Sequence, residues 1–177
     1  MRTFVALDLP PDFADDVAAL ARQLGAAVEG RFLPRSTYHL TLAFLGEVDE
    51  AQAAARAGDA LDAVCANTAP VVLASDGLGK FGRAGDATLW LGIAPTRELD
   101  DLAERLRDEL ASRGIPFDAK PFKPHITLAR RARIPKASLP PLAFPRDDRA
   151  CTATLYKSTL ERTGAVYKPL HTARLGG

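Results

Sequence analysis

Apolar and polar residues alternate along the chain in a way that predicts both strands and helices. Short apolar runs closed by turn residues predict strands at residues 3–7, 38–45, 70–74, 88–93, 122–129, 150–158 and 166–170. Residues 32–34 form a short extended piece, and a glycine-rich stretch at 77–85 is expected to connect two of the strands.

Three stretches carry apolar residues at the spacing of an amphipathic helix. The first covers residues 13–24 and is expected to end at Gly25. The second is alanine-rich and runs from an N-cap at Asp49 to about Val64. The third covers residues 99–110, with Thr96 as its N-cap and Gly114 as its stop. This order of elements favours an α+β fold, and we expect residues 1–177 to form a single domain of two interleaved, related lobes.

Composition and charge narrow the class of protein. A hydrophobic content of 47% with a net charge of +1 is typical of a soluble globular protein and argues against a general nucleic-acid coat protein. Cys65 and Cys151 form no Cys-x-x-Cys pair, so we expect no disulfide framework, no zinc site and a reducing, cytoplasmic location. No apolar run approaches the roughly 18 residues of a membrane span, so we expect no membrane partner.

One five-residue pattern occurs twice. Residues 39–43 are His-Leu-Thr-Leu-Ala and residues 125–129 are His-Ile-Thr-Leu-Ala, about half the chain apart. Each copy follows a helix and an aromatic–proline approach, at residues 32–34 and 122–124 respectively. The repeat predicts two related halves that each contribute one strand to a shared centre.

Strand geometry indicates what this pattern does. Side chains at i and i+2 share a face of a strand, so His39 lies beside Thr41, and His125 beside Thr127. Two such strands would surround one phosphorus atom with two imidazoles and two hydroxyls. A neutral imidazole would take a proton from the attacking water and an imidazolium would protonate the departing oxygen. The hydroxyls would donate to non-bridging oxygens, which stabilises charge without a metal.

Two other interpretations of the repeat are open. It could be only a duplicated fold in which histidine and threonine pair across strands. Zinc binding is weaker, because the chain has three histidines in all and no His-x-His. Two copies of one pattern, matched at four of five positions, favour the catalytic interpretation.

Basic residues surround the second copy, with Asp118 the only acid nearby: Lys120, Lys123, Arg130, Arg131, Arg133 and Lys136. They predict an anion-attracting rim, the common alternative being a solvated basic edge. Arg130 is the best candidate for binding phosphate, because a guanidinium can fork onto its oxygens. Strand alternation places Arg130 on the face of Leu128, so it reaches the site only if the strand twists or ends there.

Other aromatic and histidine residues have weaker signals. Phe44, Phe81 and Tyr156 could stack on a base, the alternative being that they belong to the core. His171 stands outside any repeated pattern and is interpreted as structural.

These residues carry a resemblance to a known family. Twin His-x-Thr-x motifs are the signature of the 2H phosphoesterase superfamily, and the chain resembles its RNA 2′,3′-cyclic phosphodiesterase branch, also called LigT-like 2′-5′ RNA ligases. The similarity covers nearly the whole chain, most clearly at residues 2–7, 39–48, 89–93, 120–130 and 155–160.

The resemblance implies a bilobal, pseudo-twofold-symmetric α+β fold with antiparallel-rich sheets lining a central cleft and helices outside. It also implies hydrolysis of 2′,3′-cyclic phosphates, on RNA ends or small cyclic nucleotides, to 2′-phosphomonoesters with no metal or cofactor. His125 would be the base and His39 the acid, with Thr41 and Thr127 on the substrate. We expect a monomer. An ATP-independent 2′-5′ RNA ligase and a non-catalytic RNA-end binder remain alternative functions.

Overall fold

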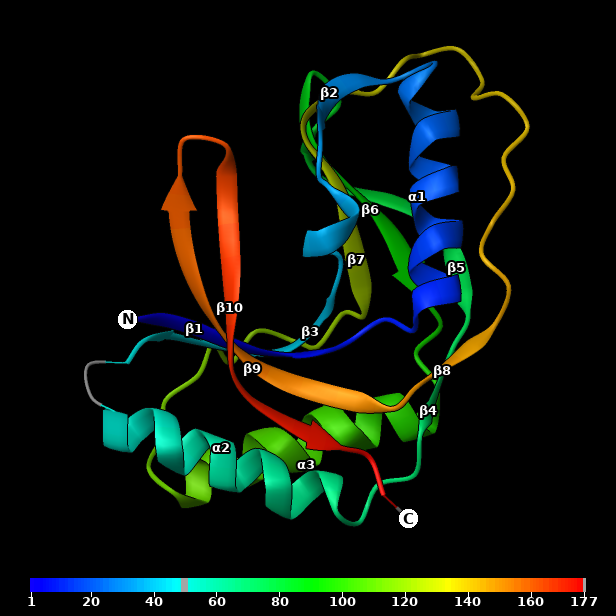
Figure 1. The fold of residues 1–177 in the computed structure, drawn as a ribbon. Coiled ribbons are helices and arrows are strands. Elements are labelled where there is room, and N and C mark those ends of the chain that lie inside the picture. Colours follow the sequence, from blue (N-terminus) through cyan, green and yellow to red (C-terminus); the bar gives the residue numbers. More distant parts are fainter. Residues whose placement is uncertain (49–50, 177) are drawn as a thin grey trace.

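The computed structural model describes residues 1–48 and 51–176 and has helices and strands in the expected alternation (Figure 1). The first elements are β1 (Arg2–Leu7), α1 (Pro11–Gly25), β2 (Glu29–Phe32), the 3₁₀ turn η1 (Arg35–Thr37), β3 (Leu40–Glu47) and α2 (Ala51–Cys65). They are followed by β4 (Val71–Leu73), β5 (Ser75–Arg83), β6 (Asp86–Ile93), α3 (Arg97–Ser112), β7 (His125–Arg133), β8 (Asp148–Ala150), β9 (Thr152–Glu161) and β10 (Gly164–Arg174). The α+β class is confirmed.

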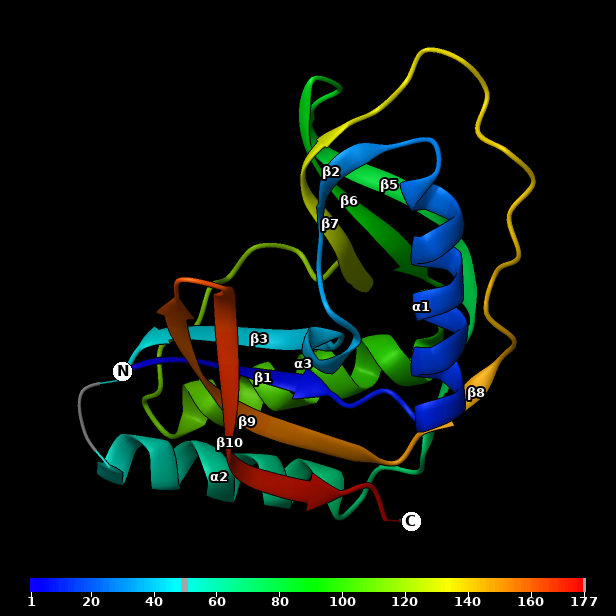
Figure 2. The same cartoon turned by 45° about the horizontal axis from the view of Figure 1, so that its top comes forward.

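Two four-stranded antiparallel sheets form the frame of the molecule. Their strand orders are β10-β9-β1-β3 and β2-β7-β6-β5, so each sheet combines strands from distant parts of the chain. β4 and β8 form a separate two-stranded ribbon. In Figures 1 and 2 the β9–β10 hairpin rises from the first sheet and stands opposite β2 and β7 of the second.

The helices lie outside the two sheets. α2 contacts β9 and β10 of the first sheet, α3 contacts β3, and α1 lies along the second sheet beside β2. Each helix buries one apolar stripe: in α1, for example, Phe13, Val17, Leu20 and Leu24 are buried. These stripes join the inner faces of the sheets in one core cluster. Within the described residues, no helix is both long and apolar enough to cross a membrane.

Several sequence-based boundaries are confirmed. The Thr96 hydroxyl accepts a hydrogen bond from the Leu99 N–H at 3.3 Å and caps α3. Gly114 follows that helix with a φ of +70°, a left-handed conformation that favours glycine. α1 ends at Gly25 as predicted. The predicted N-cap Asp49 lies outside the described residues.

The glycine-rich stretch 77–85 was expected to be a connection, and this expectation is wrong. Most of it is β5, which pairs along its length with β6. Gly79 lies opposite Trp90, and a Cβ at Gly79 would be only 2.1 Å from the indole ring. The glycine is there because the ring lies across the strand, a close approach that only glycine allows.

The two halves share a detailed three-stranded unit. In β9-β1-β3, Ala6 pairs with Thr41 and Val5 with Ala43, so one extra residue of β3 bulges between them. In β5-β6-β7, Trp90 pairs with Thr127 and Leu89 with Ala129, which leaves one bulged residue at the same place. The bulges are therefore Leu42 and Leu128, the fourth residue of each repeated pattern. The same strand pairing with a bulge at the same position in both halves is how the pseudo-twofold symmetry is seen in the structure.

Candidate active site

The two repeated histidines are held in the same way. His39 immediately precedes β3, and its Nδ1 is 2.8 Å from the carbonyl oxygen of Thr37. His125 begins β7, and its Nδ1 is 2.6 Å from the carbonyl oxygen of Lys123. A carbonyl oxygen can only accept a hydrogen bond, so Nδ1 carries a proton in both rings. Each Nε2 is therefore left to accept a proton, or to donate one when the ring is charged.

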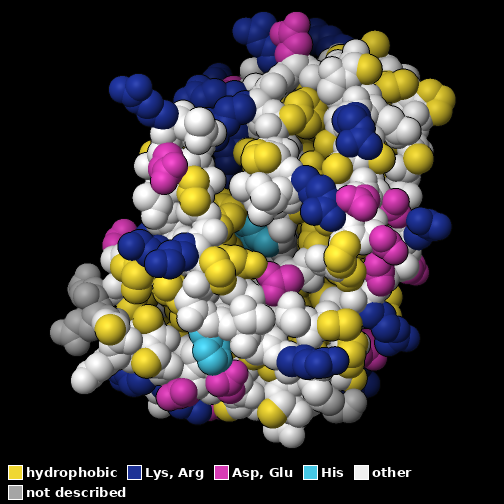
Figure 3. Space-filling model, viewed as in Figure 1, with side chains coloured by type: hydrophobic (Ala, Val, Ile, Leu, Met, Phe, Trp, Pro, Cys, Tyr) yellow, Lys and Arg dark blue, Asp and Glu magenta, His cyan; other side chains and the backbone are white. Residues whose placement is uncertain are grey.

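Both histidines belong to one site. β3 and β7 contact each other across the boundary between the two sheets, and a positive charge on His125 lowers the pKa of His39. Figure 3 shows histidine at the bottom of a hollow in the molecular surface between the two lobes. Both side chains are half-buried, so the rings are shielded from bulk water yet open to a ligand.

Thr41 and Thr127 lie on the same face as the histidines. Both are half-buried, whereas Leu40 and Ile126, which alternate with them, are fully buried. Within residues 1–48 and 51–176, neither hydroxyl has a protein hydrogen-bond partner. Each is therefore available to donate to an oxygen bound beside the imidazole.

The bulge at Leu128 brings Arg130 to this face as well. Leu128 and Ala129 are consecutive and both buried, so the alternation shifts by one residue and Arg130 is exposed. The positive charge of Arg130 lowers the pKa of both His39 and His125, which places its guanidinium within electrostatic reach of both rings. Strict alternation would have placed Arg130 on the buried face with Leu128. The extra residue in the strand shifts this alternation, so Arg130 lies on the face of the histidines.

The equivalent bulge in β3 gives a different side chain. Leu42 and Ala43 are both buried, and Phe44 is 47% exposed at the position that corresponds to Arg130. The bulged carbonyl oxygens are satisfied differently too: that of Leu42 accepts from the Arg107 guanidinium at 3.4 Å, and that of Leu128 from the Leu33 N–H at 2.8 Å. The two halves of the site therefore match in backbone geometry and differ in charge.

Different aromatic rings surround the two histidines. His39 lies 4.8 Å from Phe4 and 5.2 Å from Tyr167, measured between ring centroids. His125 lies 5.2 Å from Phe81 and 5.7 Å from Trp90. These aromatic rings pack against the imidazoles, and the hydrogen bonds from Nδ1 to the backbone carbonyl oxygens set the orientation of each imidazole.

The charged groups near the two imidazoles also differ. Among the charges near His39, Asp8 favours its protonated form, whereas His125 and Arg130 favour its neutral form. Near His125, Lys123 and Arg130 both favour the neutral form. Burial is the largest cause in both cases and brings the net pKa of each ring below its usual value. The Lys123 ammonium lies 4.8 Å above the Trp90 ring, a cation–π contact that holds it beside His125.

Asp8 is held in place by hydroxyl groups of β9. Its Oδ2 accepts hydrogen bonds from Thr152 at 2.8 Å and Thr154 at 2.6 Å, and its Oδ1 accepts from the Tyr156 hydroxyl. Burial and this carboxylate together raise the pKa of Tyr156. The sequence did not single out Asp8, because its partners lie at the other end of the chain.

The remaining sequence candidates separate into those near the site and those away from it. Phe81 contacts His125 and is 42% exposed, whereas Tyr156 is half-buried and stacks on Phe4 at 5.5 Å. Nε2 of His171 lies 2.8 Å from Oδ1 of Asp62 in α2, away from the other two histidines. Trp90 and Tyr167 were missed as site residues.

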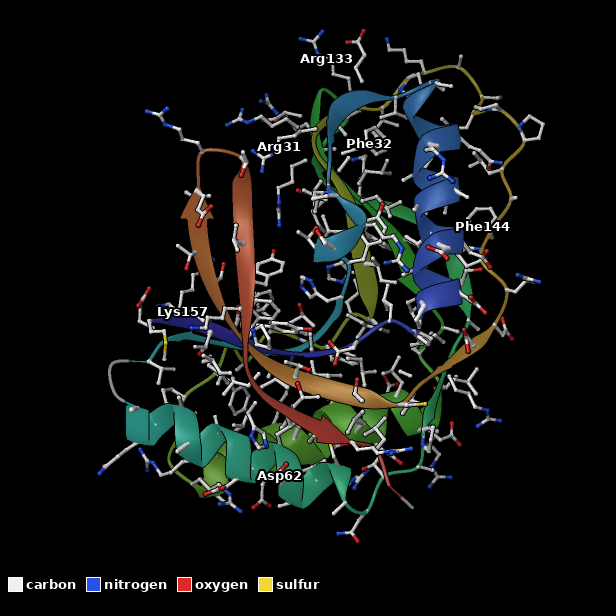
Figure 4. All side chains as sticks on the ribbon, in the orientation of Figure 1. Arg31, Phe32, Asp62, Arg133, Phe144 and Lys157 are labelled. Atoms are coloured by element: carbon white, nitrogen blue, oxygen red, sulfur yellow. The ribbon has the colours of Figure 1, made fainter. Side chains whose placement is uncertain are left out.

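The predicted basic rim is only partly at the site. Lys123 and Arg130 face the histidines, whereas the Lys120 ammonium lies 3.7 Å from Asp118 and Arg133 pairs in register with Glu29 at the far end of β7. Figure 4 shows Arg133 at the outer end of its strand. Among the described residues no group of three or more histidine, cysteine or acidic side chains is placed to hold a metal ion.

The structure places one His-x-Thr strand from each of two related sheets beside a common hollow, as the resemblance to the 2H phosphoesterases implies. The family model of the 2′-5′ RNA ligase superfamily matches residues 9–153, and the chain belongs to that family. An RNA 2′,3′-cyclic phosphodiesterase of Thermotoga maritima is 32% identical over 100% of this chain and 97% of its own.

Solved structures show the same fold. A crystal structure of a Thermus thermophilus protein has a TM-score of 0.82 and 30% identity, with 100% of this chain and 99% of that chain covered. Escherichia coli LigT complexed with 3′-AMP has a TM-score of 0.78 and 32% identity, with 98% of this chain and 97% of that chain covered. The similarity thus extends over essentially the whole length of each protein.

Proposed function

We propose that this protein hydrolyses 2′,3′-cyclic phosphates at RNA ends to 2′-phosphomonoesters. The observation that carries the proposal is the pair of equivalent imidazoles, each with Nδ1 bound to a carbonyl oxygen and Nε2 free to exchange a proton. The family, and relatives named RNA 2′,3′-cyclic phosphodiesterase, support the substrate class. The 3′-AMP bound to Escherichia coli LigT supports a nucleotide in the cleft.

The asymmetry of charge supports a direction for proton transfer. His125, beside Lys123 and Arg130, is the neutral base that takes a proton from water. The water oxygen forms a bond to phosphorus, the bond from phosphorus to the 3′ oxygen breaks, and His39 gives its proton to that oxygen. Asp8 favours the charged form of His39 that this step requires.

The other groups bind the phosphate. Thr41 and Thr127 donate to its non-bridging oxygens, and Arg130 places a positive charge next to the centre where negative charge builds up. Strain in the five-membered cyclic phosphate makes the 3′ oxygen a good leaving group, so this set of residues suffices without a metal.

The direct test uses the three histidines of the chain. His39→Ala and His125→Ala should each reduce hydrolysis of a cyclic-phosphate oligonucleotide by roughly 10²- to 10⁴-fold, because each removes one proton-transfer step. His171→Ala is the matched control, since His171 lies away from the site against α2. Chromatography with phosphorus NMR of the product separates 2′- from 3′-phosphate.

Two results would contradict the proposal. Tight binding of the cyclic end with no turnover by the natural chain would indicate the non-catalytic RNA-end binder. A similar loss of activity in all three histidine variants would show that the loss reflects folding and not chemistry.

The name of the family gives weight to ligation as a second function. The same residues would join RNA ends if a ribose 5′ hydroxyl, in place of water, attacked phosphorus. Adding a second RNA with a 5′-hydroxyl end to the assay measures this directly. Joined 2′-5′ product without any hydrolysis product would replace the hydrolase assignment.

A further inference from the structure

A second positively charged hollow adjoins the candidate active site. It is a cavity of about 430 Å³, within the usual range for small-ligand sites. Its wall combines three arginines, an exposed aromatic ring and one acid with smaller residues: Arg31, Phe81, Gly82, Asp86, Ala87, Thr88, Arg130 and Arg131. Two of these residues also belong to the surroundings of His125, so the cavity opens beside the proposed reaction centre.

The three arginines come together through strand pairing. Arg31 of β2 lies opposite Arg130 of β7 in the register, and Arg131 follows directly. Among the described residues none of the three has a carboxylate within 4.0 Å. Three guanidinium groups around one cavity repel each other unless an anion lies between them. Guanidinium groups also match the geometry of phosphate oxygens.

Arg131 has a backbone conformation that is uncommon for its residue type. Its φ is +50°, the only positive φ among the non-glycine residues of the described chain. This conformation costs free energy for a residue with a Cβ, and such costs are concentrated at functional sites. Here it follows from the irregular pairing of β2 with β7.

Arg31 also connects the cavity to the opposite lobe. A Cβ on Gly164 would lie 3.0 Å from Nη2 of Arg31, so the guanidinium rests against the start of β10. Figure 4 shows Arg31 at the end of β2 that faces the β9–β10 hairpin. The guanidinium of Arg31 therefore lies between the two lobes.

We propose that this cavity binds a second phosphate, the one on the 5′ side of the terminal nucleotide. The proposal rests on the proposed function, because it places the cyclic phosphate at His39 and His125. Phe81, which contacts His125 and is 42% exposed, offers a surface on which a base can stack between the two phosphates. The enzyme would then prefer oligonucleotides to 2′,3′-cyclic mononucleosides.

Three substrates test the proposal. They are adenosine 2′,3′-cyclic phosphate, the same nucleotide with a 5′-phosphate, and a dinucleotide with a cyclic end. The second and third carry the extra phosphate, and the dinucleotide alone carries it as a phosphodiester. We expect kcat/KM to be about tenfold or more higher for a substrate with the extra phosphate, mainly through KM. A response of both substrates indicates recognition of any 5′-phosphate, and a response of the dinucleotide alone indicates the internucleotide linkage.

The variants are Arg31→Gln and Arg131→Asn, since asparagine tolerates a positive φ. For each variant we compare kcat/KM for a substrate with the extra phosphate to kcat/KM for the substrate without it. Each substitution should reduce this ratio by about tenfold. Arg97→Gln is the control, because the Arg97 side chain is 90% exposed on α3 and is not among the residues lining the cavity. A ratio that stays unchanged in both variants, or a natural chain without preference, overturns the second phosphate site.

The proposed function can fail separately. If the natural chain hydrolyses no cyclic phosphate, the proposed function is wrong. The second phosphate site is then tested by a binding measurement. Fluorescence anisotropy with a labelled dinucleotide ending in a 2′-phosphate should then show weaker affinity in Arg31→Gln and Arg131→Asn than in Arg97→Gln. Equal affinity in all three overturns it.

Discussion

The packing of Trp90 over Gly79 allows a quantitative prediction about Gly79→Ala. The new Cβ would lie 2.1, 2.2 and 2.6 Å from three atoms of the indole ring, where ordinary contact begins at 3.4 Å. The ring must therefore move by about 1.3 Å or more. Trp90 contacts His125, with ring centroids 5.7 Å apart, and carries Lys123 over its face. Displacement of the ring would therefore disturb His125, the proposed base.

The magnitudes follow from this overlap. Overpacking of a core typically lowers the free energy of unfolding by about 1–3 kcal/mol. Replacing glycine by alanine in a compatible conformation raises it by about 0.4–1 kcal/mol, because the unfolded chain loses entropy. We expect a net loss of about 1–2 kcal/mol in the free energy of unfolding. A misplacement of about 1 Å at a catalytic group lowers activity by up to about 10²-fold, so kcat should fall by roughly 10- to 100-fold.

Three measurements check the prediction. Urea unfolding gives the stability, steady-state hydrolysis gives kcat, and Trp90, as the only tryptophan, reports its own displacement by fluorescence. The control is Gly85→Ala, where a Cβ meets nothing within 4 Å. If Gly79→Ala matched Gly85→Ala in stability, emission and kcat, the packing argument would be refuted.

Further predictions concern pH, the threonines and metal dependence. Because His125 is the base and His39 the acid of the proposed reaction, the pH–rate profile should be bell-shaped, rising as His125 loses its proton and falling as His39 loses its own. Burial lowers the pKa of each histidine, so both limbs should lie at lower pH than for an exposed imidazole. Asp8→Asn should lower the pKa of His39 and move the alkaline limb to lower pH; an unmoved limb would contradict the acid role of His39. Thr41→Val and Thr127→Val should each lower kcat by roughly 10²-fold with little change in KM, and a pure KM effect would argue against transition-state binding. Activity should persist in EDTA, and its loss with recovery on adding a metal would refute the metal-independent mechanism.

Local patterns determined a large part of this protein from the sequence. Helix ends at Gly25 and Gly114 were predictable because turn and cap chemistry acts within a few residues. The repeated pattern at His39 and His125 identified the two central strands, because side-chain alternation is a property of the strand itself. That these histidines and their threonines are catalytic remains a prediction.

The tertiary structure decided what depends on partners far along the chain. The bulges at Leu42 and Leu128 are hidden in the sequence, because each is followed by another apolar residue and the shift becomes visible only against a neighbouring strand. That shift turns Arg130 towards both histidines. Asp8, the negative charge near His39, is held by hydroxyl groups of β9, so its place at the site depends on contacts far apart in the sequence. The sequence by itself determined two equivalent histidines and the basic residues beside the second one, whereas tertiary packing brought Asp8 to the first and turned Arg130 towards both.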